Sequence, residues 1–280
     1  MSIERFNFRI SNYVLIDTST VKDYSDLKKA LFEAVAETIK DESSLAIAFS
    51  GGIDSSLLAR ICKDLGRKVL LLTIGFPESH DIDYSKRIAS KMGLSHKIHK
   101  LNEEHFRDSI EYVRQKVDCQ NISHIENCIA YLYIATLACE NDVKLILTAN
   151  GCDELFCGYN AYRLMYNHGK THIMDLMTEK IENEFILMKE IEMVTTAFGV
   201  NFKQPFLSRN FISFAKDIPI DQKVRRSDDF VRKHILREAA LSLGVPRESA
   251  MRPKKALQYS TLIHKKFKTL LKQNNKKQKL

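Results

Sequence analysis

Short strand-like runs alternate with longer stretches of helical periodicity through the first half of the chain. The runs predicted as strands are 45–49, 69–74, 96–99 and 144–148. Helical spacing of apolar residues covers 27–39, 57–66, 82–92, 103–117 and 126–139. Nearly continuous apolar strands are typical of parallel sheets covered on both faces, and the alternation with helices indicates crossover connections. The pattern predicts an α/β fold with a doubly wound, mostly parallel sheet.

From about residue 171 the pattern becomes wholly helical, with helices expected at 173–197, 208–217 and 229–243. Because no long Ser/Gly linker precedes this part, we expect a helical extension of the same domain. The expected organisation is one domain over residues 1–264 and a basic tail over 265–280. Within the domain, an α/β nucleotide-binding part covers about 21–165 and a helical part about 166–264. Residues 1–20 alternate weakly, as in an edge strand or a leader.

Three polar segments directly follow predicted strands: Ser50–Ser56, Gly75–Asp81 and Asn150–Tyr159. In doubly wound sheets the ligands bind beyond the carboxyl ends of the strands. We therefore expect these segments, which lie far apart in the sequence, to meet at one edge of the sheet and form one site.

The first of these segments, Ser50-Gly51-Gly52-Ile53-Asp54-Ser55-Ser56, has the chemistry of a pyrophosphate site. A strand, a Gly-rich turn and a helix direct several backbone N–H groups at one point, and small glycines let a polyanion approach. Asp54 fits such a site when a divalent cation lies between its carboxylate and the phosphates. The loop is not a Walker A motif, because no Gly-Lys-Ser/Thr follows. The alternative interpretation is an ordinary tight turn before a capped helix.

The composition is that of an ordinary globular protein, with 44% hydrophobic and 28% charged residues. No apolar run approaches the length that spans a bilayer, and the start has no signal-peptide core. We therefore expect a cytoplasmic protein without a membrane partner.

The net charge of +8 is concentrated at the end of the chain, because residues 265–280 hold seven lysines and no acid. Without this tail the charge is near +1. Such a tail is typical of a solvated, partly disordered end, and the alternative is contact with RNA or a membrane surface.

Six cysteines show neither CxxC pairs nor the density of a disulfide scaffold. Cys128 and Cys139 are interpreted as small core residues, and Cys62 lies in a predicted helix. Cys152 and Cys157 flank an acidic motif, but a zinc site is disfavoured because no His or second Cys pair lies at ligand spacing.

The Gly loop resembles the PP-loop of the N-type ATP pyrophosphatases, which cleave ATP to AMP and pyrophosphate. Later segments resemble the asparagine synthetase family within that superfamily, in the family's order over residues 45 to about 259. The segments are 147–159 with its Asp153-Glu154 pair, Phe198-Gly199-Val200 with Pro205-Phe206-Leu207, and 233–238 with Arg252-Pro253-Lys254-Lys255.

The resemblance implies ATP and Mg²⁺ as cofactors and assigns roles residue by residue. Ser50, Gly51, Gly52, Ser55 and Ser56 would bind the β and γ phosphates, and Asp54 with Asp153 would hold Mg²⁺. Lys254 would contact the α-phosphate, and Tyr159 would lie beside the acyl-adenylate. The strand ends and the start of the acidic motif would line the nucleotide: Ala48, Ile74, Thr148, Ala149 and Gly151. Without the resemblance, Asp153-Glu154 could simply cap a helix, Lys254 could be solvated and Tyr159 could be a core residue.

Two departures from the family pattern bear on the nitrogen donor. Family members that use glutamine begin with a glutaminase domain whose nucleophile is a Cys after the initiator Met, whereas Ser2 stands here. We therefore expect this chain to use free ammonia, a separate glutaminase subunit or another nucleophile.

The second departure is Asn150, which stands where the asparagine-forming enzymes have a glutamate that takes a proton from ammonium. An amide cannot act as a general base. The replacements considered are Glu154, Glu126 and a water, or an acceptor other than ammonium. Ser123, His124 and Glu126 are candidates by position for recognising the amino acid.

The leading hypothesis is an ATP-dependent ligase that adenylates a carboxylate, first of all that of aspartate, releases pyrophosphate and amidates the acyl group with ammonia, releasing AMP. A second hypothesis is an AMP-forming amide ligase acting on another carboxylate or on RNA, to which the tail could contribute. A third is a non-catalytic nucleotide-binding subunit of a glutaminase complex.

Overall fold

The structure is a computed structural model that describes residues 24–253 and 257–277. Its centre is a sheet of five parallel strands: β1 (Ser44–Ala48), β2 (Lys68–Gly75), β3 (Ser95–Lys100), β4 (Leu145–Leu147) and β5 (Asn201–Lys203). The spatial order is β3-β2-β1-β4-β5. The doubly wound α/β class predicted from the sequence is confirmed. Strand β5 lies in the part expected to be wholly helical, and that expectation is wrong there.

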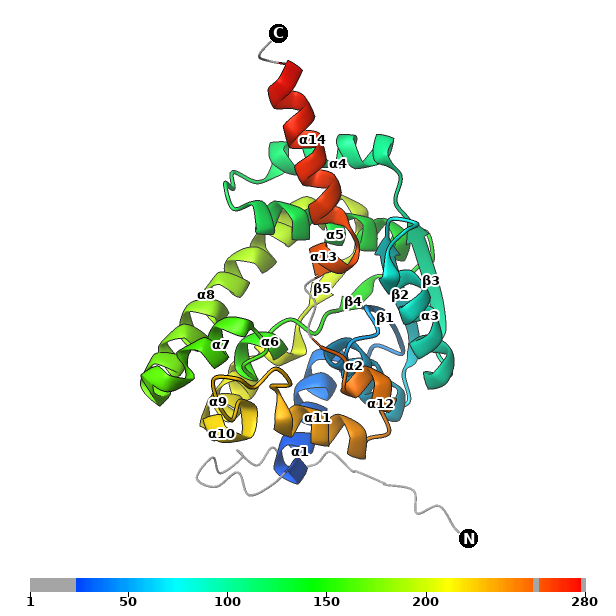
Figure 1. The fold of residues 1–280 in the computed structure, drawn as a ribbon. Helices are drawn as coiled ribbons and strands as arrows, with labels where there is room; N and C mark the ends of the chain where they lie inside the picture. Colours follow the sequence, from blue (N-terminus) through cyan, green and yellow to red (C-terminus); the bar gives the residue numbers. More distant parts are fainter. Residues whose placement is uncertain (1–23, 254–256, 278–280) are drawn as a thin grey trace.

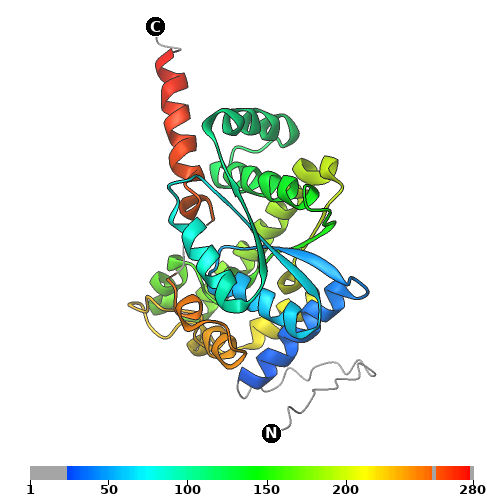
Figure 2. The same cartoon turned by 90° about the vertical axis from the view of Figure 1, so that its right-hand side faces the viewer.

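Helices cover both faces of this sheet (Figures 1 and 2). Along β1 successive side chains point to opposite faces, so Leu45 and Ile47 belong to one apolar core and Ala46 to the other. The longer helices are α1 (Tyr24–Ile39), α2 (Ile53–Asp64), α3 (His80–Met92), α4 (Glu103–Lys116), α5 (Ile122–Cys139), α8 (Lys170–Thr195), α9 (Arg209–Asp217), α11 (His234–Ser242) and α14 (Ile263–Lys277). The short ones are α6 (Cys152–Leu155), α7 (Asn160–Met165), α10 (Ile220–Lys223), α12 (Arg247–Ala250) and α13 (Leu257–Ser260).

The strand order creates a switch point between β1 and β4. The chain runs outward from β1 through β2 to β3, then crosses to the other side of β1 and continues with β4 and β5. Connections leave β1 and β4 in opposite directions, and in open α/β sheets ligands bind in the crevice at this point. The loops after β1 and β4 are the Gly loop and the acidic motif of the sequence analysis.

Helix α5 corrects the expectation that no apolar run reaches membrane-spanning length. By length and composition its 18 residues could cross a membrane, but 72% of them are buried inside the described structure. Apolar residues occur all around the helix because it packs between the sheet, α4, α8 and the C-terminal helices. Burial in the core accounts for its composition.

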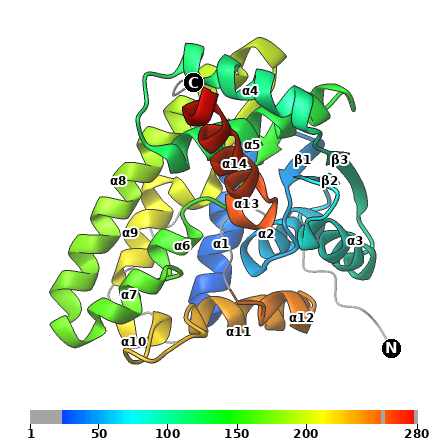
Figure 3. The same ribbon diagram turned by 45° about the horizontal axis from the view of Figure 1, so that its top comes forward.

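The expected disordered tail is also wrong over much of its length, because Ile263–Lys277 forms helix α14 beside α4 and α5 (Figure 3). Ile263 and Phe267, one turn apart, are fully buried. Lys266 forms an ion pair with Glu103 of α4 at 2.5 Å. The apolar residues at helical spacing fix this segment to the core and leave Lys265, Lys268 and Lys272 exposed. The weak alternation of residues 1–20 lies outside the described residues.

Candidate active site

The Gly loop after β1 is held together by its own hydroxyl groups. Ser50 N–H donates to Ser55 Oγ at 3.3 Å, and Ser55 Oγ donates to the Gly52 carbonyl at 3.3 Å. Gly51 has φ +72°, and a Cβ there would lie 3.0 Å from the Tyr84 ring. Gly52 is the N-cap of α2 and offers no capping side chain, so an anion can receive the first N–H groups of this helix.

The C-terminal part of the chain supports this loop from outside. Ser249 Oγ donates to the Gly51 carbonyl at 2.7 Å and lies 2.8 Å from Ser56 Oγ. Arg252 donates to the Ser50 carbonyl at 3.1 Å and forms an ion pair with Asp81 at 2.6 Å. Arg252 thereby links the loops after β1 and β2, as expected for segments at one edge of the sheet.

The acidic motif after β4 begins with a glycine that has little room. Gly151 has φ +98°, and a Cβ there would lie 2.9 Å from the Phe206 carbonyl oxygen. Glu154 accepts a hydrogen bond from Gly151 N–H at 3.1 Å, so this acid does cap the N-terminus of α6. Asp153 points elsewhere. The capping interpretation therefore describes Glu154 and not Asp153.

Asp153 and Asp54 converge on the ammonium group of Lys233. Lys233 Nζ lies 2.7 Å from both carboxylate oxygens of Asp54 and 2.7 Å from Asp153 Oδ1. Its side chain is 2% exposed. Burial alone would lower the pKa of Lys233, but the charges of Asp153 and Asp54 outweigh it and raise the pKa. Two carboxylates from different loops that share one cation form a donor set that suits Mg²⁺, with Lys233 Nζ lying between them here.

Lys233 begins one of the segments that resemble the family, but the sequence predicts no role for it. It lies 179 residues from Asp54, and its backbone has the uncommon left-handed conformation, with φ +54°. Asp229 sets up the turn by accepting hydrogen bonds from the N–H groups of Val231 and Arg232, each at 3.0 Å. Burial would raise the pKa of Asp229, but hydrogen bonds from the N–H groups of Arg232 and Arg225 and from His234 outweigh it and lower the pKa to about 2.

Gly158 makes room for the ion pair between Asp153 and Lys233. A Cβ at residue 158 would lie 2.0 Å from Asp153 Oδ1 and 2.4 Å from Lys233 Cε. The Gly158 N–H donates to the Asp153 carbonyl at 2.7 Å, and its own carbonyl accepts from Arg232 at 3.1 Å. The missing side chain is therefore a condition of the site's geometry.

A second polar group lies behind the acidic motif. Tyr159 Oη donates to Glu154 Oε1 at 2.5 Å, and Tyr131 Oη donates to Asn150 Oδ1 at 2.7 Å. The Asn150 amide donates to Glu184 Oε1 of α8. Burial, then the charges of Glu154 and its acidic neighbours, raise the pKa of Tyr159, so its hydroxyl stays protonated. Glu184 was not identified from the sequence.

The residues predicted to contact adenine lie where expected, at the ends of neighbouring strands. Ala48 ends β1, Ile74 lies near the end of β2, and Thr148 with Ala149 follows β4. Ile74 and Thr148 are 2% and 1% exposed, whereas Ala48 and Ala149 are half-buried. The side chains of the two alanines are therefore the more accessible to a nucleotide. Lys254 lies outside the described residues.

The candidates near the start of α5 face the C-terminal helices and α8. Ser123 Oγ accepts from Gln258 at 3.0 Å, and Glu126 pairs with His264 at 2.8 Å. Burial raises the pKa of Glu126, which His264 partly offsets. The described contacts do not link Glu126 to Asn150, so its proposed role as a replacement base finds no support there.

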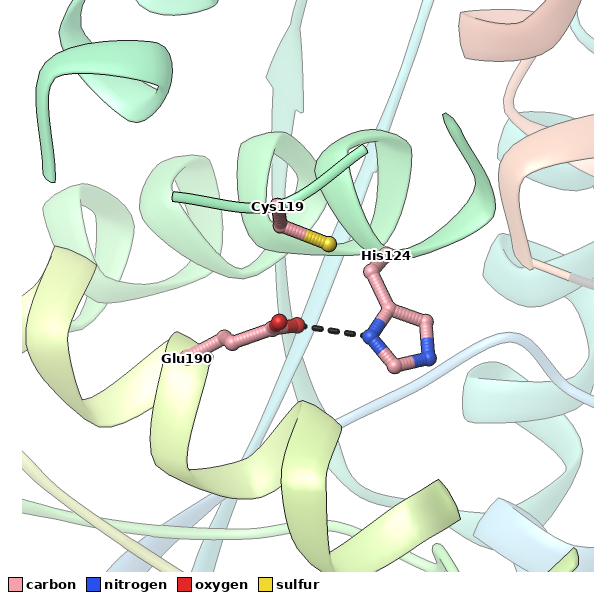
Figure 4. Close-up of side chains that lie close together, drawn as sticks. All are labelled: Cys119, His124 and Glu190. Atoms are coloured by element: carbon pink, nitrogen blue, oxygen red, sulfur yellow. Dashed lines mark hydrogen bonds and ion pairs between the residues drawn. The ribbon is translucent and has the colours of Figure 1, made fainter. Parts of the chain in front are cut away.

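His124 lies in a group of three side chains that could hold a metal ion, with Cys119 and Glu190 (Figure 4). His124 Nδ1 lies 2.7 Å from Glu190 Oε2. Two ligands about 2 Å from one zinc ion at a tetrahedral angle stand more than about 3 Å apart. The two side chains are therefore hydrogen-bonded directly to each other. Cys152 and Cys157 are buried, and burial raises the pKa of the Cys157 thiol to about 12; neither belongs to such a group among the described residues.

Known proteins were compared with the chain. A model of the family described as asparagine synthase matches residues 26–186 and 171–279. A Methanocaldococcus jannaschii protein, named as a candidate glutamine-hydrolyzing asparagine synthetase, is 27% identical over 271 residues, covering 86% of this chain and 49% of the relative. Asparagine synthetase 2 of Oryza sativa, also named glutamine-hydrolyzing, is 26% identical over 225 residues, covering 76% and 38%. The chain thus spans half or less of these relatives.

One solved structure, an NH₃-dependent NAD synthetase from Campylobacter jejuni, aligns with a TM-score of 0.36 and 18% identity over 49% of this chain and 61% of the other. The fold is defined by the sheet itself. That sheet, with a Gly loop and an acidic motif at its switch point, defines a doubly wound α/β protein of the nucleotide-binding type. The chain belongs to the asparagine synthase family.

Proposed function

We propose that this chain is an AMP-forming carbon–nitrogen ligase. ATP adenylates a carboxylate, with the side chain of aspartate as the first candidate, and pyrophosphate leaves from the Gly loop. Ammonia then attacks the acyl group, and AMP leaves. Forming an activated intermediate divides a difficult condensation into two easier steps.

The observation that carries this proposal is the convergence of Asp54 and Asp153 beside the Gly loop, with Lys233 Nζ 2.7 Å from each. Two carboxylates this close to a polyphosphate would oppose its binding unless a cation intervened. We propose that both hold Mg²⁺ when ATP is bound, and that the ion neutralises phosphate charge. The N–H groups and serines of the Gly loop then receive the β and γ phosphates.

Other residues of the site have roles that follow from their contacts. Arg252 is anchored by Asp81 and Ser50 at the loop, so its charge lies where a phosphate would arrive. Tyr159 presents a protonated hydroxyl beside Glu154 and can turn its hydrogen bond from Glu154 to the acyl group. Lys254 keeps the role that the family resemblance implies, contact with the α-phosphate.

The nitrogen donor has two candidates. Free ammonia needs no further protein. The second candidate is glutamine, which a separate glutaminase subunit or segment would hydrolyse. It is favoured because the relatives are named glutamine-hydrolyzing and the chain covers half or less of their length. A cytoplasmic location also stays a prediction.

The test is a reaction of the purified chain with ATP, Mg²⁺, aspartate and ammonium, in which AMP, pyrophosphate and asparagine are quantified by mass spectrometry. Equal amounts of AMP and asparagine are expected, and Asp54→Ala should abolish both. Formation of AMP without asparagine would support adenylation of a carboxylate and exclude aspartate as the acceptor. If no AMP forms with any carboxylate tested, with ammonium or with a glutaminase, the result would favour a non-catalytic nucleotide-binding subunit.

An RNA acceptor requires a gentler test than deleting residues 265–280, because the deletion would also remove the buried Phe267. The triple variant K265Q/K268Q/K272Q removes three exposed charges of α14 and keeps the apolar contacts. Salt-sensitive RNA binding that this variant weakens would support the RNA alternative. Binding that is absent or unchanged would leave α14 a structural helix.

A further inference from the structure

Glu184 occupies a position on helix α8 where the pattern calls for an apolar residue. The buried side of α8 runs through Ile173, Met177, Ile181, Glu184, Leu187, Ile191 and Val194. Glu184 is only 6% exposed. A carboxylate in an apolar stripe costs several kcal/mol unless polar partners offset its desolvation. Polar contacts therefore accompany this buried carboxylate, and the contact with Asn150 is one of them.

The partner of Glu184 is the residue that departs from the family pattern. Asn150 donates from its amide nitrogen to Glu184 Oε1, and its Oδ1 accepts from Tyr131 at 2.7 Å. The tyrosine thereby fixes which end of the amide faces Glu184. Asn150 is half-buried at the edge of the acidic motif, and Glu184 is buried. The carboxylate missing from residue 150 is thus present within one hydrogen bond of it.

Glu184 also belongs electrostatically to the rest of the site. Burial is the largest cause of the raised pKa of Tyr159, and Glu154, Asp153 and Glu184 raise it further. Tyr159 Oη lies 2.5 Å from Glu154. A protonated nitrogen that arrives between Tyr159 and Asn150 would come close to the carboxylates that these two side chains contact, Glu154 and Glu184, and each carboxylate attracts a positive charge.

We propose that Glu184 accepts the proton of the attacking nitrogen, in place of a carboxylate at residue 150; this inference rests on the proposed ligase function. Glu184 first takes a proton from the incoming ammonium on a carboxylate oxygen, which frees the nitrogen lone pair. As this lone pair forms the C–N bond, the bond between the acyl carbon and the AMP oxygen breaks and its electron pair leaves with AMP. The second proton that the nitrogen loses goes to the departing phosphate. Asn150 holds the carboxylate and contacts the nitrogen.

The test separates the two half-reactions in the full-length chain. ATP–pyrophosphate exchange with aspartate measures adenylation, and asparagine formation from ammonium chloride measures amidation. In Glu184→Gln we expect exchange to stay within about threefold of wild type and amidation to fall by about 10²- to 10³-fold in kcat, the usual contribution of a general base. Hydroxylamine, largely unprotonated at neutral pH, should show a smaller loss than ammonium.

Two further variants keep this test sharp. N150E/E184Q returns a carboxylate to residue 150 and should recover at least about tenfold of the lost ammonium-dependent activity. Glu182→Gln changes an exposed acid of the same helix and should leave both half-reactions unchanged. A variant that is merely unstable would lose exchange and amidation together.

Equal amidation by Glu184→Gln and wild type would overturn the role of Glu184 and leave the ligase function standing. An equal loss with ammonium and hydroxylamine, without recovery in N150E/E184Q, would assign Glu184 a structural role and also overturn the inference. Failure of wild type to exchange pyrophosphate with any carboxylate would instead overturn the proposed function, and this inference with it.

Discussion

Replacing Lys233 by methionine tests whether the ion pairs at the switch point hold the site together. The substitution keeps the length of the side chain and removes the charge between Asp54 and Asp153, whose side chains are 19% and 11% exposed. Removing one partner of a buried ion pair costs about 3–5 kcal/mol, because the remaining charge stays desolvated. Since Asp54 retains some access to water, we expect about 3 kcal/mol, or a Tm lower by about 6–12 °C.

The assay is urea unfolding followed by circular dichroism at pH 7, with and without millimolar Mg²⁺. If Asp54 and Asp153 form a divalent-cation site, Mg²⁺ should restore part of the stability of Lys233→Met and affect the wild type less. Because the pKa of Lys233 is raised, its contribution is fully present below the ordinary lysine range and is lost only as the pH rises above it. The wild type should thus keep it throughout the neutral range.

Lys223→Met is the matched control, because Lys223 is also fully buried but donates to the Ala215 carbonyl at 2.6 Å. At pH 7 it should cost little, and Mg²⁺ should not change its stability. A Lys233→Met protein within about 0.5 kcal/mol of wild type would refute the ion-pair reasoning. A large loss that Mg²⁺ does not reduce would retain the ion pairs and refute the metal site.

Three other outcomes follow from the geometry. Gly158→Ala places a Cβ 2.0 Å from an oxygen of Asp153, so unfolding by urea should show a loss of about 2 kcal/mol or more, and a neutral effect would contradict the tight packing. Burial lowers the pKa of Lys223 to about 8, so between that pH and about 10.4 the unfolded chain binds one proton more than the folded chain. The stability of wild type relative to Lys223→Met should therefore rise by up to about 3 kcal/mol over this pH range. A difference in stability that does not change with pH would contradict the lowered pKa. Phe267→Ala should cost about 3–5 kcal/mol in the same assay, whereas a disordered tail would show no loss.

The sheet could be predicted because most of its strands have a recognisable local sequence pattern. Runs such as Val69–Ile74 are apolar throughout, and the alternation with helices leaves few topologies. The same rule placed the loops after β1, β2 and β4 at one edge. Strand β5 gave no comparable signal, since its three residues include only one apolar side chain, Phe202. Its pairing with β4 supplies the structure that its own sequence does not specify.

The lysine-rich composition of the segment in α14 predicts disorder, whereas the spacing of its apolar residues predicts a helix. Lysines dominate the segment, but Ile263, Phe267, Leu270 and Leu271 follow one another at helical spacing and pack on the second core. Long lysine side chains can flank such an apolar stripe and keep their charges in water. The prediction of disorder would have required these apolar residues to be scattered.

The contacts between charged and polar side chains in the site could not be predicted from the local sequence pattern. Lys233 meets Asp54 across 179 residues, and Glu184 meets Asn150 across 34. Nothing in the neighbourhood of Lys233 distinguishes it from a solvated lysine. For Glu184 one signal was available: it interrupts the apolar stripe of α8. A charged residue in a stripe that is otherwise apolar indicates a buried partner, though not which one.

The balance of charge at the switch point has a consequence for how ATP binds. Asp54 and Asp153 lie together at one edge of the sheet, where both contact the ammonium group of Lys233. Free ATP would approach like charges, whereas the Mg²⁺ complex brings its own compensation. ATP should therefore bind far more weakly in EDTA than in Mg²⁺, by about 10-fold or more, as measured by calorimetry. Equal affinities would place the phosphates against Arg252 and the N-terminus of α2 alone, away from the two aspartates.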